Sequence, residues 1–414
     1  MDDPKQFLLN LFKAGLDAAD PLKALPPHLP PPPKGSTVVI GAGKAAASMA
    51  KAVETHWQEE LSGLAVTRYG YGMKTEKIKI IEAAHPVPDE AGQQAAQEIL
   101  KAATGLTADD LLLCLISGGG SALMSLPAPC LTAVEKREIN KALLKCGAPI
   151  HEMNCVRKHL SATKGGRLAL AAHPARVVTL IVSDVPGDDP ATVASGPTLP
   201  DPTTQQQALA IMKKYGIPVS GSVRSWLSDP ANETPKPGDA RFENCQTKII
   251  ARGMDSLTAA AQYAASSGVE PIILGDTVEG EARETGADHV RQAFHYLKKS
   301  PCVLLSGGET TVTMRGKGRG GRNTEYLLSA AITAAGHPQI YGIACDTDGI
   351  DGSEDNAGAF FTPGSIGSAG KMKIDAQTCL DNNDAYSFFE TAGGLVMTGP
   401  TFTNVSDFRA ILVL

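Results

Sequence analysis

A glycine-rich turn that contains a lysine is the first segment of this sequence that could do chemistry. Gly41-Ala42-Gly43-Lys44-Ala45-Ala46 fits the spacing G-x-G-x-x-A between an apolar run and an alanine-rich stretch. Backbone amides at such a strand-to-helix turn attract phosphate or carboxylate. Lys44 adds an ammonium group directed at whatever the turn binds, unless it simply points into solvent. A Walker loop is excluded because the spacing G-x-x-x-x-G-K-[ST] is absent.

The same spacing is the fingerprint of dinucleotide-binding turns, so a nicotinamide enzyme is an alternative. The next predicted strand, residues 64–67, is followed by Arg68-Tyr69-Gly70 and not by an acidic residue that would hold a ribose. An NADP site could still use Arg68. The missing acid and the lysine inside the turn both weaken the nicotinamide interpretation.

Two Ser-Gly-Gly segments lie in different halves of the chain. Each follows an apolar run, and they read Ser117-Gly118-Gly119-Gly120-Ser121 and Ser306-Gly307-Gly308-Glu309-Thr310. Strand-to-helix turns favour glycine in general, which is a sufficient explanation of the repeat. The alternative is that each of two lobes presents a backbone anion site.

Basic residues gather in two further segments. Read as a helix, the stretch from Asn154 to Arg167 places Arg157, Ser161 and Lys164 on one face, which suits either substrate anchoring or a solvated surface. The second segment, Met314-Arg315-Gly316-Lys317-Gly318-Arg319-Gly320-Gly321-Arg322-Asn323, alternates cations with glycines just before a predicted helix. Arginine matches phosphate oxygens with two donors, so this loop favours an anion site over a disordered basic loop.

Carboxylates crowd two loops that follow buried strands. The first is Ser183-Asp184-Val185-Pro186-Gly187-Asp188-Asp189, and the second is Asp346-Thr347-Asp348-Gly349-Ile350-Asp351. Neighbouring carboxylates repel one another unless they are solvated, bind a cation or serve as acid and base. An EF-hand is rejected for the second loop because Ala357 stands at the position of the required glutamate. Mg²⁺ binding or a catalytic carboxylate remains, with plain turn chemistry as the alternative.

These clusters need elements that position them, and the pattern predicts an α/β protein. Apolar strands alternate with helices, which indicates a parallel sheet covered on both faces. Every polar cluster falls at the carboxyl end of a predicted strand, where open parallel sheets bind ligands. A chain of 414 residues predicts two domains, and residues 219–243 have the composition of a boundary. We therefore expect domains at 1–240 and 241–414.

Composition excludes several classes of function. The net charge of −6 argues against nucleic-acid binding, and no apolar run approaches the roughly 18 residues of a membrane span. No CxxC pair occurs among the eight cysteines, so a reducing cytoplasm is the simplest location. The partner expected is a small anionic molecule, with neither nucleic acid nor membrane.

Taken together, these segments resemble the glycerate 2-kinases of the MOFRL-domain family, some of whose members were named hydroxypyruvate reductases. Thr324 and Phe402 depart from the family pattern, where Gln and Gly are frequent. The matching stretches run in order along nearly the whole chain: Ile40 to Ala45, Ala84 to Asp89, Ser117 to Ala122, Val156 to Arg167, Ser183 to Val185 with Gly187 and Asp188, Ala194 to Thr198, Gly307 to Thr310, Gly320 to Asn323 with Glu325, Asp346 to Gly349 and Thr398 to Thr401.

The resemblance implies ATP-dependent, Mg²⁺-assisted phosphorylation of D-glycerate at its 2-hydroxyl. It also implies a Rossmann-like N-terminal lobe, a C-terminal α/β lobe and an active-site cleft between them. Lys44 and Arg322 are expected to balance the transferred phosphoryl group, and Arg157 with Lys158 to hold the glycerate carboxylate. Asp184 is assigned to accept the hydroxyl proton. Mg²⁺ is assigned to Asp188, Asp346 and Asp348, although the residues alone do not divide these jobs.

Further expected contacts to substrate or phosphate come from Gly43, Ser117, Gly118, Gly119, Ser121, Ser306, Gly307, Gly308, Glu309 and Asn323. Two alternatives stay open: an NAD(P)H-dependent hydroxypyruvate reductase, and a non-catalytic module that senses sugars or phosphates. The sequence is compatible with a homodimer and does not fix the oligomeric state.

Overall fold

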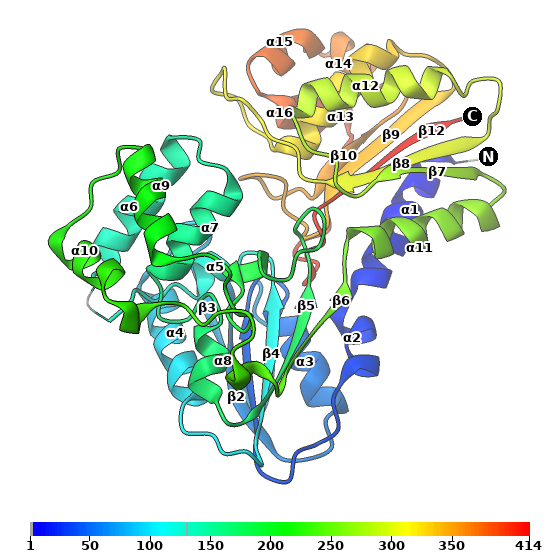
Figure 1. Cartoon of the computed structure of the whole chain (residues 1–414). Coiled ribbons are helices and arrows are strands. Elements are labelled where there is room, and N and C mark those ends of the chain that lie inside the picture. The colour runs from blue at the N-terminus through cyan, green and yellow to red at the C-terminus, as the bar shows by residue number, and fades with distance from the viewer. Residues whose placement is uncertain (1–2, 130) are drawn as a thin grey trace. The chain divides into compact units, whose positions relative to one another are not determined.

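The computed structural model describes residues 3–129 and 131–414, and these form two compact units (Figure 1). The central unit comprises Ala24–Ser183 and Asp189–Ile250. The terminal unit comprises the residues up to Lys23, the short segment Asp184–Asp188 and Ala251–Leu414. The structure thus divides the chain near residue 250 instead of 240, and it assigns the first helix to the unit that holds the C-terminus.

The central unit contains a six-stranded sheet in the order β3-β2-β1-β4-β5-β6. Its strands are β1 (Thr37–Ala42), β2 (Leu61–Arg68), β3 (Ile78–Ala83), β4 (Leu111–Ser117), β5 (Arg176–Val182) and β6 (Cys245–Ala251). The β1–β2, β2–β3, β1–β4 and β4–β5 pairs are parallel. This is the strand order of dinucleotide-binding folds, in which ligands bind where the order reverses, between β1 and β4. The expected Rossmann-like N-terminal sheet is confirmed.

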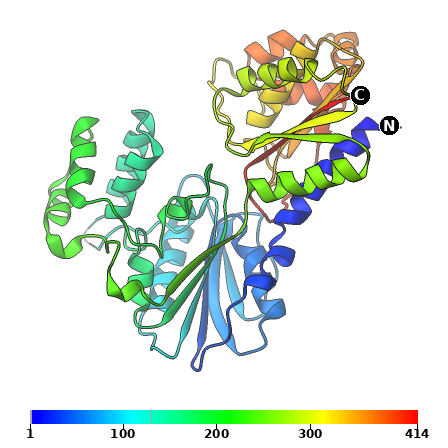
Figure 2. The ribbon, with the colours of Figure 1, turned by 45° about the vertical axis from the view of Figure 1, so that its right-hand side comes forward.

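Helices of the central unit fall into two groups. The first group lies close to the sheet and comprises α3 (Ala46–His56), α4 (Glu90–Ala103), α5 (Gly120–Leu123) and α8 (Arg167–Ala172). The second group stands beside the sheet and has an apolar core of its own (Figure 2). It comprises α6 (Ala133–Lys145), α7 (Ile150–His159), α9 (Gln205–Lys214) and α10 (Gly221–Ser228). Single-turn helices complete the unit at η1 (Pro26–His28), η2 (Val193–Ser195), η3 (Pro230–Asn232) and η4 (Ala240–Phe242), and α2 (Pro21–Ala24) precedes them.

The terminal unit contains a mixed sheet in the order β11-β10-β9-β12-β8-β7. Its strands are β7 (Glu270–Gly275), β8 (Cys302–Gly308), β9 (Ile340–Asp346), β10 (Gly358–Phe361), β11 (Leu395–Val396) and β12 (Asp407–Val413). The last strand, β12, runs antiparallel to both β8 and β9. The carboxyl ends of β8 and β9 therefore meet the first residue of β12, and Asp407 lies opposite both Gly308 and Asp346.

Helices cover both faces of this second sheet (Figure 1). One face carries α1 (Pro4–Ala19) and α11 (Gly253–Ser266), and the other carries α12 (Ala282–Phe294), α13 (Arg322–Ala334), α14 (Ser365–Lys371), α15 (Ala376–Asp381) and α16 (Ala385–Ala392). Because side chains alternate along a strand, Val303 and Leu305 pack toward α1 and α11, whereas Leu304 packs toward α13. This alternation explains why the central strands are apolar throughout.

Helix α1 belongs to the terminal unit because of its apolar stripe. Phe7, Leu8, Leu11 and Phe12 are buried in the same core as Leu257 of α11 and Phe408 of β12. Gly15 sits where an added Cβ would lie 2.4 Å from Ser256 Oγ, so the two helices approach closely at this point. No helix in residues 3–129 or 131–414 is long and apolar enough to cross a membrane.

Candidate active site

The two glycine turns of the central unit pack against each other at the point where the strand order reverses. Gly43 has φ of 137°, and an added Cβ would lie 2.1 Å from Ser117 Oγ. The Ala45 amide donates to Ser117 Oγ at 3.0 Å, and the Lys44 amide donates to the Gly118 carbonyl at 2.8 Å. Glycine is therefore required at position 43 by the neighbouring turn, and the contact places Lys44 beside the Ser117–Ser121 segment.

The amides of the first turn are used within the protein. Besides those of Lys44 and Ala45, the Gly43 amide donates to Val66 and the Ala46 amide to Gly43. The expectation that these four amides attract an anion is therefore wrong. What the turn offers a ligand is the side chain of Lys44, which is half-buried.

The second turn has a different hydrogen-bond pattern. Gly119 adopts the left-handed conformation, with φ of 79°, and the first helical bond is made by the Ala122 amide. For Gly119, Gly120 and Ser121, no partner of the amide is found among the described residues. Consecutive unpaired amides are typical of anion-binding turns, so the expected phosphate contacts fit this turn better than the first.

Ser121 continues the turn with a buried polar cluster. Lys164 Nζ donates to the Ser121 carbonyl at 2.8 Å and to its Oγ at 3.0 Å. Ser121 Oγ lies 2.9 Å from Ser195 Oγ, which in turn lies 3.4 Å from Asn154 Oδ1. The sequence did not single out Ser195 or Asn154 as site residues, because their contact with Ser121 comes from the tertiary fold.

The basic segment 154–167 divides into cations with and without an acidic partner. Lys158 is buried, and its ammonium lies 3.5 Å from the carboxylate of Asp201, which is also buried. Arg157 makes no ion pair among the described residues. The structure thus leaves Arg157 available for the expected substrate contact, while Lys158 already has a carboxylate.

Arg322 lies among three carboxylates in the terminal unit. Its Nε donates to Asp407 at 2.9 and 3.0 Å, its Nη2 to Asp346 at 2.8 Å, and its Nη1 lies 3.1 Å from Glu309. Burial alone would lower the pKa of Arg322, but Asp407 and Asp346 raise that pKa well above its usual value. Asp346 and Asp407 are buried, whereas the Glu309 side chain is 52% exposed. A phosphate that binds Arg322 would therefore displace the exposed Glu309 more easily than the buried Asp346 or Asp407.

Asp407 and Arg409 are candidate site residues that sequence reasoning missed. Asp407 also accepts from Asn323 Nδ2 at 2.7 Å and from Arg409 Nη2. Arg409 is fully buried, and its Nη1 donates to the Gly307 carbonyl at 3.2 Å. The sequence did contain a signal for these two residues. Two charges spaced two residues apart at the start of an apolar strand point to the same face of the sheet, which indicates a shared polar site.

Asp351 holds the beginning of α13, the helix that carries Arg322. Its carboxylate accepts from the Asn323 amide at 2.9 Å, from the Thr324 amide at 2.8 Å and from Thr324 Oγ1 at 2.8 Å. Burial raises the pKa of Asp351, although these donors favour the charged form. The carboxylate thus takes the place of a helix N-cap, since Gly321 has no side chain to offer. Thr324, one of the two departures from the family pattern, is a partner of this carboxylate.

The loop before β12 ties the other acidic residues together. Asn404 Nδ2 donates to Asp184 Oδ2 at 2.8 Å, and Ser406 Oγ donates to the Asp184 carbonyl at 2.6 Å. The Thr401 amide donates to the Asp348 carbonyl at 3.2 Å. Asp184, Asp346 and Asp348 therefore belong to one local network in the terminal unit.

Phe402, within the same loop, has a φ of 60°. This left-handed conformation is costly for a bulky residue and would suit the glycine that the family pattern led us to expect at this position.

The carboxylates of the terminal unit offer few free oxygens to a metal ion. No group of three His, Cys, Asp or Glu side chains converges for a metal within residues 3–129 and 131–414. Asp346 accepts from Arg322 and from the Asp348 amide, and Asp188 lies 3.6 Å from Arg252. A resident metal held by protein alone does not fit these residues. Kinases commonly bind Mg²⁺ through one or two carboxylates plus substrate phosphates, and Asp348 with Asp346 fits that smaller requirement.

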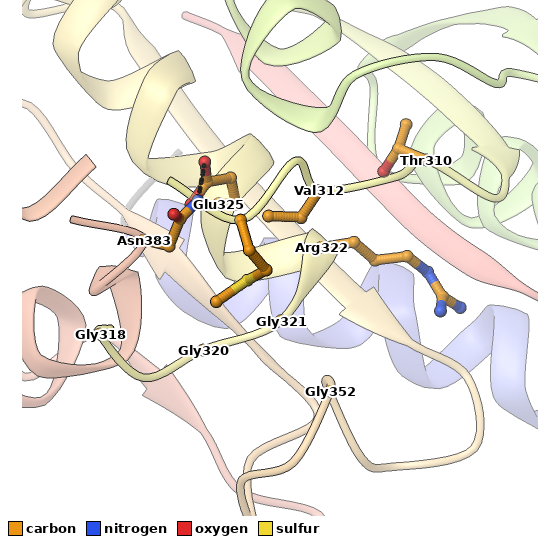
Figure 3. A pocket seen from close by; sticks show the side chains of 10 residues that line it. Thr310, Val312, Gly318, Gly320, Gly321, Arg322, Glu325, Gly352 and Asn383 are labelled. Atoms are coloured by element: carbon orange, nitrogen blue, oxygen red, sulfur yellow. Dashed lines mark hydrogen bonds between the residues drawn. The ribbon is translucent and has the colours of Figure 1, made fainter. Parts of the chain in front are cut away.

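The basic glycine loop is ordered by contacts to the protein. The amides of Arg315 and Gly316 donate to Asn383 Oδ1, and Arg319 pairs with Glu354 at 2.6 Å. The loop lines a cavity of about 280 Å³ together with Glu325 and Asn383. Figure 3 shows that Arg322 points away from Glu325 and Asn383. Of the last two residues of this loop, Arg322 is the better candidate for the expected phosphate contact, because Asn323 Nδ2 already donates to Asp407 at 2.7 Å.

The second Ser-Gly-Gly segment is not a turn. Ser306, Gly307 and Gly308 are the last residues of strand β8, and a loop leads from Glu309 to α13. The Gly307 carbonyl accepts from Arg409, and an added Cβ on Gly308 would lie 2.4 Å from the backbone of Val278. The expectation of two equivalent anion turns is therefore wrong, because only the first segment opens a helix.

Comparisons with known proteins agree with this architecture. Residues 7–228 match a family model described as a domain of unknown function, DUF4147, and residues 302–407 match the MOFRL family. The chain is 50% identical to an Agrobacterium vitis protein named as a hydroxypyruvate reductase, over 99% of this chain and 94% of that protein. It is 38% identical to the D-glycerate 2-kinase of Thermotoga maritima, with both chains covered completely.

A crystal structure of glycerate kinase from Thermotoga maritima superposes with a TM-score of 0.90 at 36% identity, covering 99% of each chain. Full-length likeness in sequence and in structure, together with both family models, shows that this chain belongs to the MOFRL-domain glycerate kinase family.

Proposed function

We propose that this protein is a glycerate 2-kinase, which transfers the terminal phosphoryl group of ATP to the 2-hydroxyl of D-glycerate and releases ADP. The observation that carries the proposal is the 38% identity to a D-glycerate 2-kinase over the complete length of both chains. Phosphoryl transfer depends on positioning and on neutralising charge, and the chain supplies buried cations and carboxylates suited to both.

Each group has a role in this proposal. Lys44 and Arg322 neutralise the charge of the phosphoryl group during transfer. Asp184, held by Asn404 and Ser406, accepts the proton of the 2-hydroxyl. Asp346 and Asp348 would hold a Mg²⁺ ion bound together with ATP, and that ion would supply positive charge to the phosphates. Asp188, which contacts Arg252, is a weaker candidate for the metal.

The proposed cytoplasmic location is supported by free thiols at Cys114, Cys155, Cys302 and Cys345. A homodimer also remains a proposal.

The test is an ADP-release assay with purified full-length protein, ATP, Mg²⁺ and D-glycerate. We expect ADP formation that depends on glycerate, and a product identified as 2-phosphoglycerate by phosphorus NMR. L-glycerate and a reaction without acceptor serve as controls. ATP hydrolysis that does not depend on glycerate would contradict the proposal, and 3-phosphoglycerate as product would correct the position of transfer.

The second candidate is a hydroxypyruvate reductase, which the names of the Agrobacterium vitis relatives and the Rossmann strand order favour. Oxidation of NADH or NADPH by hydroxypyruvate, measured by absorbance, would establish it. The geometry argues against it, because β2 ends at Arg68 without a ribose-binding acid and the turn amides are already paired. Failure of both assays while D-glycerate still binds would favour the sensing module.

A further inference from the structure

Three basic side chains of the central unit are buried near one another without an acidic partner. Lys136 of α6 is 3% exposed, Lys164 is 1% exposed, and Arg157 of α7 is partly buried. None of them forms an ion pair within residues 3–129 and 131–414, in contrast to Lys158, whose partner is Asp201. We call Lys136, Arg157 and Lys164 the cationic cluster.

The Leu126 carbonyl brings two of these residues together, because it accepts from Lys136 Nζ at 3.0 Å and from the amide of Ala162, two residues before Lys164. The pKa shifts agree with this placement. Burial, followed by repulsion from Arg157, lowers the pKa of Lys136 to about 7. Burial, followed by repulsion from Lys136 and Arg157, lowers the pKa of Lys164 well below its usual value. Removing an ion from water costs several kcal/mol, and a cluster of one sign adds repulsion to that cost. Such an arrangement is stabilised by an anion.

Neutral polar groups contact two members of the cationic cluster, Lys164 and Lys136. Lys164 contacts Ser121, whose hydroxyl meets Ser195, and Ser195 meets Asn154. Lys136 donates to the Leu126 carbonyl at 3.0 Å, which is the partner found for its ammonium among the described residues. A lysine ammonium has three donors, so Lys136 retains the capacity to bind a ligand.

Lys136 also lines a cavity of about 250 Å³. The wall of this cavity includes the polar side chains of Ser125, Arg137 and Asn140, and the acidic side chains of Asp89 and Glu90. Asp89 is already engaged, because it accepts from the Gly92 amide at 2.9 Å and from the Tyr69 hydroxyl at 2.8 Å. Lys136 is the member of the cationic cluster that the wall of this cavity includes. Buried cations beside hydroxyl and amide groups match a compact hydroxy acid better than a long polyphosphate.

We propose that the cationic cluster of Lys136, Arg157 and Lys164 is an oxyanion site that binds the carboxylate of the hydroxy-acid substrate, with Ser121, Ser195 and Asn154 meeting its hydroxyl groups. This deepens the proposed function and rests on it. The site uses Lys164 and Lys136 in place of Lys158, whose charge is already balanced by Asp201.

Lys136→Met is the decisive variant, because it removes a charge without leaving an unpaired buried acceptor. The Leu126 carbonyl still accepts from Ser161 Oγ at 3.2 Å and from the Ala162 amide at 3.1 Å. Replacing a buried, uncompensated charge by an apolar side chain of similar length is expected to leave the melting temperature unchanged or to raise it. Lys141→Met, at an exposed position of the same helix, is the matched control.

Full-length wild type, Lys136→Met, Lys164→Met and Lys141→Met are compared by calorimetric titration with D-glycerate, ATP and inorganic phosphate, and by steady-state kinetics. We expect the dissociation constant and KM for D-glycerate to rise tenfold or more in Lys136→Met and Lys164→Met, with kcat changed less than threefold in Lys136→Met. The ATP constants and every constant of Lys141→Met should stay within twofold of wild type.

Three results would overturn the inference. If Lys136→Met lowers the melting temperature and leaves glycerate binding unchanged, the lysine is structural. If ATP or inorganic phosphate loses affinity instead of glycerate, the cluster binds phosphate and the carboxylate assignment is wrong. If wild type phosphorylates D-glycerate and no constant changes in the variants, the cluster is not a site. By contrast, a wild type that neither binds nor phosphorylates D-glycerate contradicts the proposed function itself.

Discussion

Replacing Asp407 by asparagine removes the carboxylate shared by Arg322, Asn323 and Arg409. Asp407 is 2% exposed and Arg409 is fully buried, so the substitution leaves Arg409 without a buried counter-charge. Breaking a buried ion pair by removing one partner typically costs about 3–5 kcal/mol. Asparagine retains one acceptor oxygen for these donors, so we expect the lower end, about 3 kcal/mol.

A loss of about 3 kcal/mol corresponds to a fall in melting temperature of roughly 6–12 °C for a domain of this size. The assay is differential scanning calorimetry of the full-length protein at neutral pH, in which the transition of the terminal unit should shift. The control is Asp288→Asn, whose partner Arg291 lies at the surface, with side chains 61% and 65% exposed. Exposed pairs contribute about 0.2–1 kcal/mol, so the control should shift by no more than ~4 °C.

Catalysis gives an independent measure of the same contact. Because Asp407 orients Arg322 through its Nε, we expect kcat to fall by at least tenfold in Asp407→Asn at a temperature where the variant is folded. An Asp407→Asn protein that melts within 2 °C of wild type and retains its kcat would refute the reasoning, because Arg322 and Arg409 would then not depend on this carboxylate.

Three further outcomes are expected. Lys44→Met should lose kcat by about a hundredfold or more, because the side chain acts on transferred charge. A near-normal rate would remove Lys44 from the mechanism. Gly63→Ala should lose at least ~3 kcal/mol of unfolding free energy in urea titrations, because its Cβ would lie 1.8 Å from the Val39 carbonyl oxygen. The control is Gly105→Ala, which has open space around it and should lose only the ~1–2 kcal/mol that its left-handed φ costs. Burial raises the pKa of Glu233, but hydrogen bonds from Gln205 and Lys236 outweigh burial and lower that pKa to about 2. The free energy of unfolding should therefore fall as the pH drops from about 4.5 toward 2, and it should fall less in Glu233→Gln.

The sequence was sufficient for the α/β class and for the placement of the polar clusters at the carboxyl ends of strands. Apolar strands such as Leu111–Ser117 and their following polar turns are local features, and parallel sheets bring those turns to one edge. The antiparallel placement of β12 between β8 and β9 depends on long-range contacts, which no local sequence pattern encodes. That placement is what brings Asp407 to Arg322, and for this reason the residue was missed.

Hydrogen bonding explains the other differences. The spacing around Gly43 correctly indicated a turn, but its amides are satisfied by Ser117 and Gly118, which lie more than seventy residues away in the chain. In the basic segment, the sequence could not distinguish Lys158 from Lys164. Lys158 pairs with the carboxylate of Asp201 and Lys164 contacts the neutral Ser121, and only folding brings these partners near. Charge pattern alone therefore identified the region without identifying its free cations.

The membership of helix α1 in the terminal unit has a consequence for how the chain is made. Its partners in the core begin at Leu257, so the helix leaves the ribosome well before anything can cover Phe7, Leu8 and Leu11. At synthesis rates of 5–20 residues per second, this delay is about ten to fifty seconds. During that interval the central unit can fold completely, while the amphipathic N-terminus is exposed to chaperones. A fragment that begins after Lys23 would lack one layer of the terminal unit, so neither unit can be obtained intact by a single cut of the chain.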